Sequence, residues 1–102
     1  MASQYIYVVS LDAVPTYDDP NLDQFSKAKI AAFIRKSTPE GIESVVTDVL
    51  AEEGWQVTSY NGIFGPTAAE QVDEDEVLQH AFTSATEKGF SAVIVAYPAT
   101  IH

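Results

Sequence analysis

The chain has 102 residues, of which 46% are apolar and 20% are charged, and its formal net charge at pH 7 is −10. This length predicts one domain, residues 1–102, that buries roughly two thirds of its unfolded surface, and the apolar share excludes an intrinsically disordered chain. The absence of cysteine excludes disulfides, thiolate nucleophiles and cysteine-bound metals. The negative charge disfavours direct binding to nucleic acid or to anionic membranes.

The N-terminal segment indicates a cytoplasmic protein. The sequence MASQYIYVV lacks the basic leader of a secretory signal. The longest apolar stretches, near Tyr5–Val9 and Ala92–Tyr97, are far shorter than the roughly 20 residues of a membrane helix. We therefore expect no membrane contact.

The first predicted elements are a strand and a helix. Tyr5–Leu11 is rich in β-branched and aromatic residues and predicts a strand with apolar side chains on both faces. Asp19, Pro20 and Asn21 are typical of a helix start. The predicted helix runs to Lys36, and a broad apolar side is formed by Leu22, Phe25, Ile30, Phe33 and Ile34.

A second helix is predicted directly afterwards. Thr38, Pro39 and Glu40 combine a capping hydroxyl, a proline for the first turn and an acid that favours it. Gly54 suits the helix end. Apolar residues recur at helical spacing, which predicts one buried stripe of Ile42, Val45, Val46, Val49 and Leu50.

The second half of the chain predicts two strands and a helix. Trp55–Tyr60 reads as a half-buried strand, and Asn61-Gly62 favours a hairpin turn, so that Ile63-Phe64 would form a short returning strand; a plain loop is the alternative. A third helix is predicted from about residue 68 or 74 to Lys88, with Gly89 as its end. The last strand, Phe90–Tyr97, is almost continuously apolar, which predicts burial on both faces.

The element order β-α-α-β-(short β)-α-β predicts the fold class α/β: a small single-domain layered sheet with three main strands and at least some parallel pairing. Two strands that are apolar on both faces are many for so small a sheet. Either helices cover both faces or a second copy of the chain buries the remainder, and we lean slightly toward a homodimer.

Four consecutive acids, Asp73 to Glu76, lie one turn before His80 on the third predicted helix. The spacing of Glu76 and His80 is one that metals use, but a metal site needs three or four ligands. Asp73 and Glu76 also match a capping box, for which Thr67 and Glu70 compete. At 100° per residue, the side opposite Leu78 and Phe82 holds Asp73, Glu76, His80, Thr83 and Glu87. Capping and a solvated face are the favoured interpretation, and no metal is expected.

A second acidic group follows the first strand, at Asp12, Asp18, Asp19 and Asp23. If all strands were parallel, Asp12, Asn61 and Tyr97 would converge at one sheet edge, where ligands bind in open α/β sheets. An Asp there could hold Mg²⁺ beside a phosphate. The sequence has neither a P-loop nor a G-x-G-x-x-G motif, so we favour turn and helix-start roles for these acids.

The basic residues are concentrated in one segment. Residues 27–37 contain Lys27, Lys29, Arg35 and Lys36 and no acid, whereas residues 38–102 contain eleven acids against Lys88. On a helix these four bases flank the apolar side and form no single row, so they are expected to snorkel at the edges of a packed face.

These features predict a small soluble acidic protein that is not an enzyme, needs no cofactor and acts by protein–protein contact, as an inhibitor or adaptor that engages a basic surface. The acidic helix face could imitate nucleic acid. The expected contact residues are Asp73, Glu76, His80, Glu87, Tyr17, Tyr60 and Phe64. The alternatives are a nucleotide- or small-ligand-binding domain, a metal-assisted hydrolase with acidic ligands at the strand ends, and a structural homo-oligomer.

Overall fold

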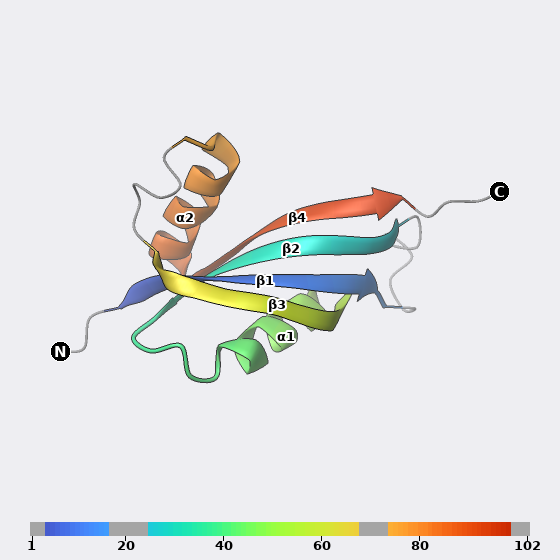
Figure 1. Cartoon of the computed structure of the whole chain (residues 1–102), viewed down its shortest axis with the longest axis horizontal. Helices are drawn as coiled ribbons and strands as arrows, with labels where there is room; N and C mark the ends of the chain where they lie inside the picture. The colour runs from blue at the N-terminus through green and yellow to red at the C-terminus, as the bar shows by residue number, and fades with distance from the viewer. Residues whose placement is uncertain (1–3, 17–24, 68–73, 99–102) are drawn as a thin grey trace.

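The computed structural model describes residues 4–16, 25–67 and 74–98. Within these residues the chain forms a four-stranded sheet and two helices in the order β1-β2-α1-β3-α2-β4 (Figure 1). The elements are β1 (Tyr5–Pro15), β2 (Phe25–Lys36), α1 (Ile42–Glu52), β3 (Trp55–Thr67), α2 (Glu76–Lys88) and β4 (Phe90–Pro98).

The sheet is antiparallel throughout, so the prediction of a layered α/β fold with parallel pairing is wrong. Its strand order is β3-β1-β2-β4, and β1 lies between β3 and β2. The physical reason lies in residues 25–36, which form a strand and not the predicted helix. Since residues 25–36 are themselves a strand, they pair with β1 as its antiparallel neighbour, from Tyr5 opposite Lys36 to Ala13 opposite Ala28.

Strand β2 is buried on both faces, which explains the error. Every second residue faces one core: Ala28, Ile30, Ala32 and Ile34 are at most 2% exposed. Phe33 is 1% exposed and points to the opposite face. A strand with apolar residues on both faces has no clear alternation, and its spacing can be fitted to a helix as well. Packing on both sides of the sheet decides between the two.

Helix α1 confirms the second predicted helix, with a later start. Ile42, Val46 and Leu50 form its buried stripe, while Val45 is 37% exposed. The N-cap is Gly41 at φ 74°, and the Ile42 amide donates to the Pro39 carbonyl. The segment before Gly41 is therefore a turn, and Gly41 provides the left-handed conformation that leads into the helix.

Strand β3 is continuous through Asn61-Gly62, so the predicted hairpin turn is wrong. Tyr60 pairs with Leu11 and Gly62 pairs with Ser10, which leaves Asn61 as an extra residue in a β-bulge. The long strand β1 offers a partner to both halves of β3, so the chain has no need to fold back. Near its end, Gly65 has φ 142°, and a Cβ there would lie 2.9 Å from Tyr7 Cδ1.

Helix α2 confirms the third predicted helix and its end at Gly89, which has φ 93°. The Arg35 guanidinium of β2 donates to the Thr86 carbonyl in the last turn of α2 at 2.5 Å, where free carbonyls attract cations. Strand β4 follows at the edge of the sheet. The predicted burial on both faces is wrong for its centre, because Ile94 is 41% and Val95 is 53% exposed.

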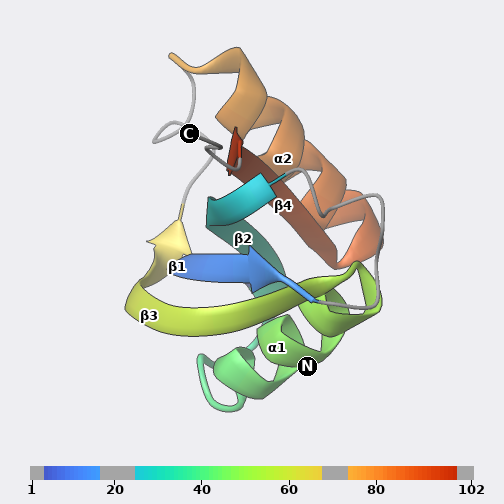
Figure 2. The same cartoon turned by 90° about the vertical axis from the view of Figure 1, so that its right-hand side faces the viewer.

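Two hydrophobic cores lie on opposite sides of the sheet. On the α1 side, helix α1 packs against alternate residues of β1 and β2 and against Trp55. On the α2 side, a smaller core joins Ile6 and Phe33 to Ala81 and Ala85. Figure 2 shows the twisted sheet nearly end-on, with α1 beside β3 and α2 beside β4. Each side of the central strand pair therefore depends on one helix.

The two-sided burial of β2 can be tested by substitution. Phe33→Ala should lower the free energy of unfolding by about 3–5 kcal/mol, because it removes a ring that joins β2 to α2. Lys29→Ala, on an exposed residue of the same face of β2, should change it by less than about 0.5 kcal/mol. Urea unfolding followed by circular dichroism measures both. Similar losses for the two variants would contradict this packing.

Candidate functional site

The acidic run before α2 caps the helix, as predicted, but through a different residue. Asp75 is the N-cap, and its carboxylate accepts hydrogen bonds from the Val77 amide at 2.9 Å and the Leu78 amide at 3.2 Å. Asp73, the predicted cap, lies outside the described residues, as do Thr67's predicted partner Glu70 and the acids Asp18, Asp19 and Asp23. The cap satisfies amide groups that the helix itself leaves free.

The outer face of α2 places Glu76 and His80 together, as the helical spacing predicts. With Gln79 and Thr83 they line an open hollow of about 420 Å³. Glu87 is exposed further along the same helix. Among residues 4–16, 25–67 and 74–98, no group of three or more His, Asp and Glu side chains is arranged to hold a metal.

The charges of α2 follow the helix dipole. Asp75 and Glu76 lie at the N-terminal end, and Lys88 lies in the last turn, where it adjoins the one acid there, Glu87. A helix favours negative charge at its N-terminus and positive charge at its C-terminus. Stability alone therefore accounts for most of the charge pattern on α2, so the pattern by itself does not indicate a binding surface.

Of the aromatic residues proposed as partner contacts, Tyr60 and Phe64 lie on opposite sides of the sheet. The Tyr60 hydroxyl donates to the Glu43 carbonyl at 2.8 Å and lies 2.5 Å from the Thr47 hydroxyl, so it ties β3 to α1. Phe64 lies on the opposite side of the sheet, paired with Val8, and is 58% exposed. Tyr17 lies outside the described residues.

The expected convergence of Asp12, Asn61 and Tyr97 loses its basis, because it required parallel strands. Asp12 lies within β1, between Lys29 on β2 and Ser59 on β3. Asn61 and Tyr97 lie on the two outer strands, which are separated by about 14 Å across the sheet at about 4.8 Å per strand. The three side chains therefore do not surround one pocket.

The basic residues lie on a strand, so their predicted placement on a helix is wrong. Lys27 and Lys29 are two residues apart on β2, so their side chains lie on the same face of the sheet as Phe33, the α2 side. The Lys27 ammonium lies 5.5 Å from the centre of the Tyr97 ring, within range of a cation–π contact. Arg35, on the same strand, instead serves the end of α2.

A further acidic surface lies around α1 and was not singled out from the sequence. We call the acidic surface the five exposed carboxylates that precede, line and end this helix: Glu40, Glu43, Asp48, Glu52 and Glu53. The chain has no lysine or arginine from residue 37 to residue 87, and this long gap was the available signal. The alternation of acids with apolar residues, which also predicts an ordinary amphipathic helix, concealed it.

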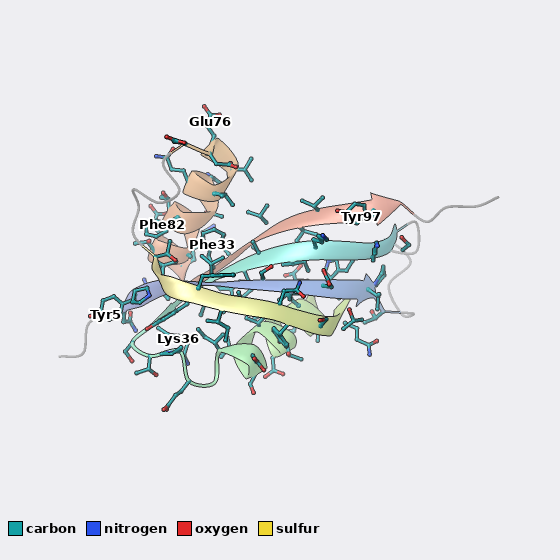
Figure 3. The ribbon with its side chains drawn as sticks, viewed as in Figure 1. Tyr5, Phe33, Lys36, Glu76, Phe82 and Tyr97 are labelled. Carbon is teal, nitrogen blue, oxygen red and sulfur yellow. The ribbon has the colours of Figure 1, made fainter. Side chains whose placement is uncertain are left out.

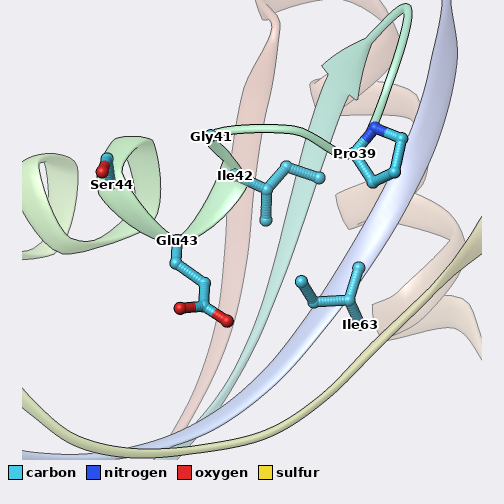
Figure 4. Close-up of a pocket in the computed structure, with 6 residues that line it drawn as sticks. All are labelled: Pro39, Gly41, Ile42, Glu43, Ser44 and Ile63. Atoms are coloured by element: carbon cyan, nitrogen blue, oxygen red, sulfur yellow. The ribbon is translucent and has the colours of Figure 1, made fainter.

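A hollow of about 310 Å³ opens at the start of α1. It is lined by Pro39, Gly41, Ile42, Glu43, Ser44 and Ile63. Figure 4 shows the Glu43 carboxylate from α1 and the Ile63 side chain from β3 on neighbouring walls. Ile63 is 40% exposed. The hollow therefore combines one carboxylate with an apolar wall.

The structural role of Asp75 gives a testable difference between neighbouring acids. Asp75→Ala should lower the free energy of unfolding by about 1 kcal/mol, because two amides of the first turn of α2 lose their acceptor. Glu74→Ala, beside it and outside the helix, should have a smaller effect. Thermal and urea unfolding of both variants measure this, and equal losses would show that the carboxylate of Asp75 is not the cap.

Comparison with known proteins gives no relative: no family of proteins, no characterised protein and no solved structure matches this chain significantly. Of the two helices in the described residues, neither has the length and apolar character to cross a membrane. The residues themselves are therefore the basis for any functional proposal.

Proposed function

We propose that the protein is a small binding protein that acts by protein–protein contact, and that its acidic surface engages a basic segment of the partner. The observation that carries this proposal is the position of Glu52 and Glu53. They form the last residue and the C-cap of α1, and no basic residue lies in that turn. Stability does not account for acids at this position.

The helix dipole makes this position unfavourable. Carbonyl groups at a helix C-terminus carry partial negative charge, and an acid nearby is disfavoured by about 0.3–1 kcal/mol at an exposed site. Glu52 and Glu53 are both exposed, and Asp48 lies one turn before Glu52 on the same helix, at a spacing where like charges repel. A surface that costs stability in this way is expected where another molecule supplies the missing positive charge.

The hollow beside Glu43 indicates the chemistry of the contact. A lysine or arginine side chain has an apolar stem and a charged head. The stem would pack against Ile63 and the head would pair with the Glu43 carboxylate, which lines the same hollow. Arginine suits the site better, because its guanidinium forms two parallel hydrogen bonds with a carboxylate.

The overall charge of −10 supports the same kind of partner. A field of one sign speeds the encounter with a basic surface and repels acidic ones. An inhibitor or adaptor role follows if the covered basic surface is one that the partner uses for another ligand. The α2 contacts predicted from the sequence, Glu76, His80 and Glu87, stay a prediction and serve as the comparison in the binding experiment.

Neutral variants test which helix carries the contact. Glu43→Gln, Asp48→Asn and Glu52→Gln combined should weaken partner capture at least tenfold, because they remove the charges and keep the side-chain shapes. Glu74→Gln, Glu76→Gln and Glu87→Gln combined remove the same charge from α2 and the residues just before it, and should leave capture within about twofold. The measurement is quantitative mass spectrometry of proteins retained from an extract of the source cells by each immobilised chain.

The captured protein should carry a basic segment and should be released by added salt, since exposed charge pairs are screened. Equal retention by the α1 variant and the unmodified chain would contradict the proposal. Retention lost only in the α2 variant would transfer the contact to α2, and capture of no protein by the unmodified chain would overturn both surfaces.

The unfavourable position of the two acids gives an independent prediction about stability. Glu52→Gln and Glu53→Gln combined should raise the free energy of unfolding by about 0.3–1 kcal/mol per residue, because each removes a charge that the helix end disfavours. Glu76→Gln, in the first turn of α2, should lower it. Urea unfolding at low salt measures both changes. A loss of stability in the double variant would remove the main argument for a binding role.

A further inference from the structure

Strand β4 presents an open edge whose only proline, Pro98, is the last residue of the strand. It is the outermost strand beside β2, and no described residue pairs with its other edge. From Phe90 to Pro98 the strand has no charged residue. Ile94 is 41% and Val95 is 53% exposed, one on each face of the sheet. Long apolar edges of this kind pair with other chains unless they are blocked.

The opposite edge of the sheet is protected. Strand β3 contains Asn61, Gly62, Gly65 and Pro66, and its register with β1 shifts at three places. Bulges, glycine and proline at an edge prevent further strand pairing. Among the described residues, the chain thus protects the edge of β3 and leaves the edge of β4 open to pairing with another strand.

The α2 side of the sheet is covered at only one end. Helix α2 lies over the start of β4, where Val93 packs against its core. Toward the end of β4 the side chains are those of Lys27, Lys29, Val95 and Tyr97, and no described helix lies over them (Figures 1 and 3). A shallow hollow of about 170 Å³ lies there between Ser10, Lys29, Val93 and Val95, among others.

We propose that β4 pairs antiparallel with β4 of a second copy of this chain, so that two four-stranded sheets become one continuous sheet. The pairing buries Ile94 against Ile94 on the α1 side and Val95 against Val93 on the α2 side. A second copy is the occupant because its own β4 is an edge of the same length and the same apolar character. This proposal concerns a surface separate from the acidic surface.

The symmetry of this pairing also brings opposite charges together. Antiparallel pairing of identical strands requires a two-fold axis perpendicular to the sheet, so the two α2 helices lie on the same side. The uncovered end of each copy then adjoins the helix-covered end of the other. Lys27 and Lys29 of one copy then lie on the same side of the sheet as helix α2 of the other copy. That helix carries Glu76 and Glu87. Charge complementarity therefore favours the antiparallel arrangement.

The same symmetry requires one residue of β4 to face its own copy. Alternate residues of a strand direct their amide and carbonyl groups to the open edge, and both copies present the same set. Two residues that pair across the axis therefore have sequence numbers that differ by an even number. The residue at the axis pairs with the same residue of the other copy. In a register that uses the full strand, that residue is Ile94, with Cα atoms about 4.5–5.5 Å apart, a distance that a disulfide spans.

Disulfide trapping tests this directly, because the chain has no native cysteine. Single cysteines at Ala92, Val93, Ile94, Val95 and Ala96 should give one maximum of covalent dimer under mild oxidation, expected for Ile94→Cys. Val45→Cys is the matched control, since Val45 is 37% exposed and lies on α1. It should cross-link at least tenfold more slowly. Equal rates at all positions, or no covalent dimer at any position in β4, would overturn the proposal.

Mass measurement without cysteine provides a second test. Size-exclusion chromatography with light scattering should give twice the chain mass of 11.1 kDa for the unmodified protein. Val95→Lys should raise the dimer dissociation constant at least tenfold, whereas Val45→Lys should leave it within about twofold, with unchanged circular dichroism spectra for both. A monomer mass at all concentrations would reject the dimer and leave the α1 contact untouched; loss of partner capture with an intact dimer would reject only the α1 contact.

Discussion

The fold depends on a central strand pair that is apolar on both faces. Strands β1 and β2 bury residues on the α1 side and on the α2 side, and neither helix alone could cover them. Two-sided burial of this kind usually belongs to parallel sheets with helices on both faces. Here an antiparallel sheet meets the same requirement, because the chain places its two helices after β2 and after β3 and lets them pack on opposite sides.

This constraint also explains how far the sequence could be interpreted. The two helices that follow β2 were predictable because each has one apolar stripe, a recognisable start and a glycine at or near its end. Residues 25–36 were not, since Ile30, Phe33 and Ile34 fit a helical spacing and a two-faced strand equally well. A helix at residues 25–36 implies parallel pairing of the strands and places Lys27 and Lys29 on a helix, and both expectations are wrong for this reason. The expected hairpin at Asn61-Gly62 has a separate cause, because this dipeptide is a strong hairpin signal when only its neighbours in sequence are considered.

The candidate site shows the same division between local and tertiary information. Capping of α2 by an acid was predictable, since it needs only neighbouring residues, but the choice of Asp75 required the backbone conformation. The two helices have similar acidic character, and only the observed helix ends distinguish them: the last turn of α2 has one acid, Glu87, beside Lys88, whereas α1 ends in two acids with no base in its last turn. Composition could not separate these cases, because the sign of the energy depends on which helix end each residue occupies.

The central position of β1 also bears on how the chain reaches this structure. Of the four strands, Tyr5–Pro15 is synthesised before the other three and has a neighbour on each side. One of these neighbours, Trp55–Thr67, emerges only after β2 and α1. Pairings so distant in sequence are slow to form and expose unpaired strands in the meantime. During synthesis, one edge of β1 therefore stays unpaired until Trp55 and the rest of β3 have left the ribosome. This period ends when β3 pairs with β1 and packs against α1.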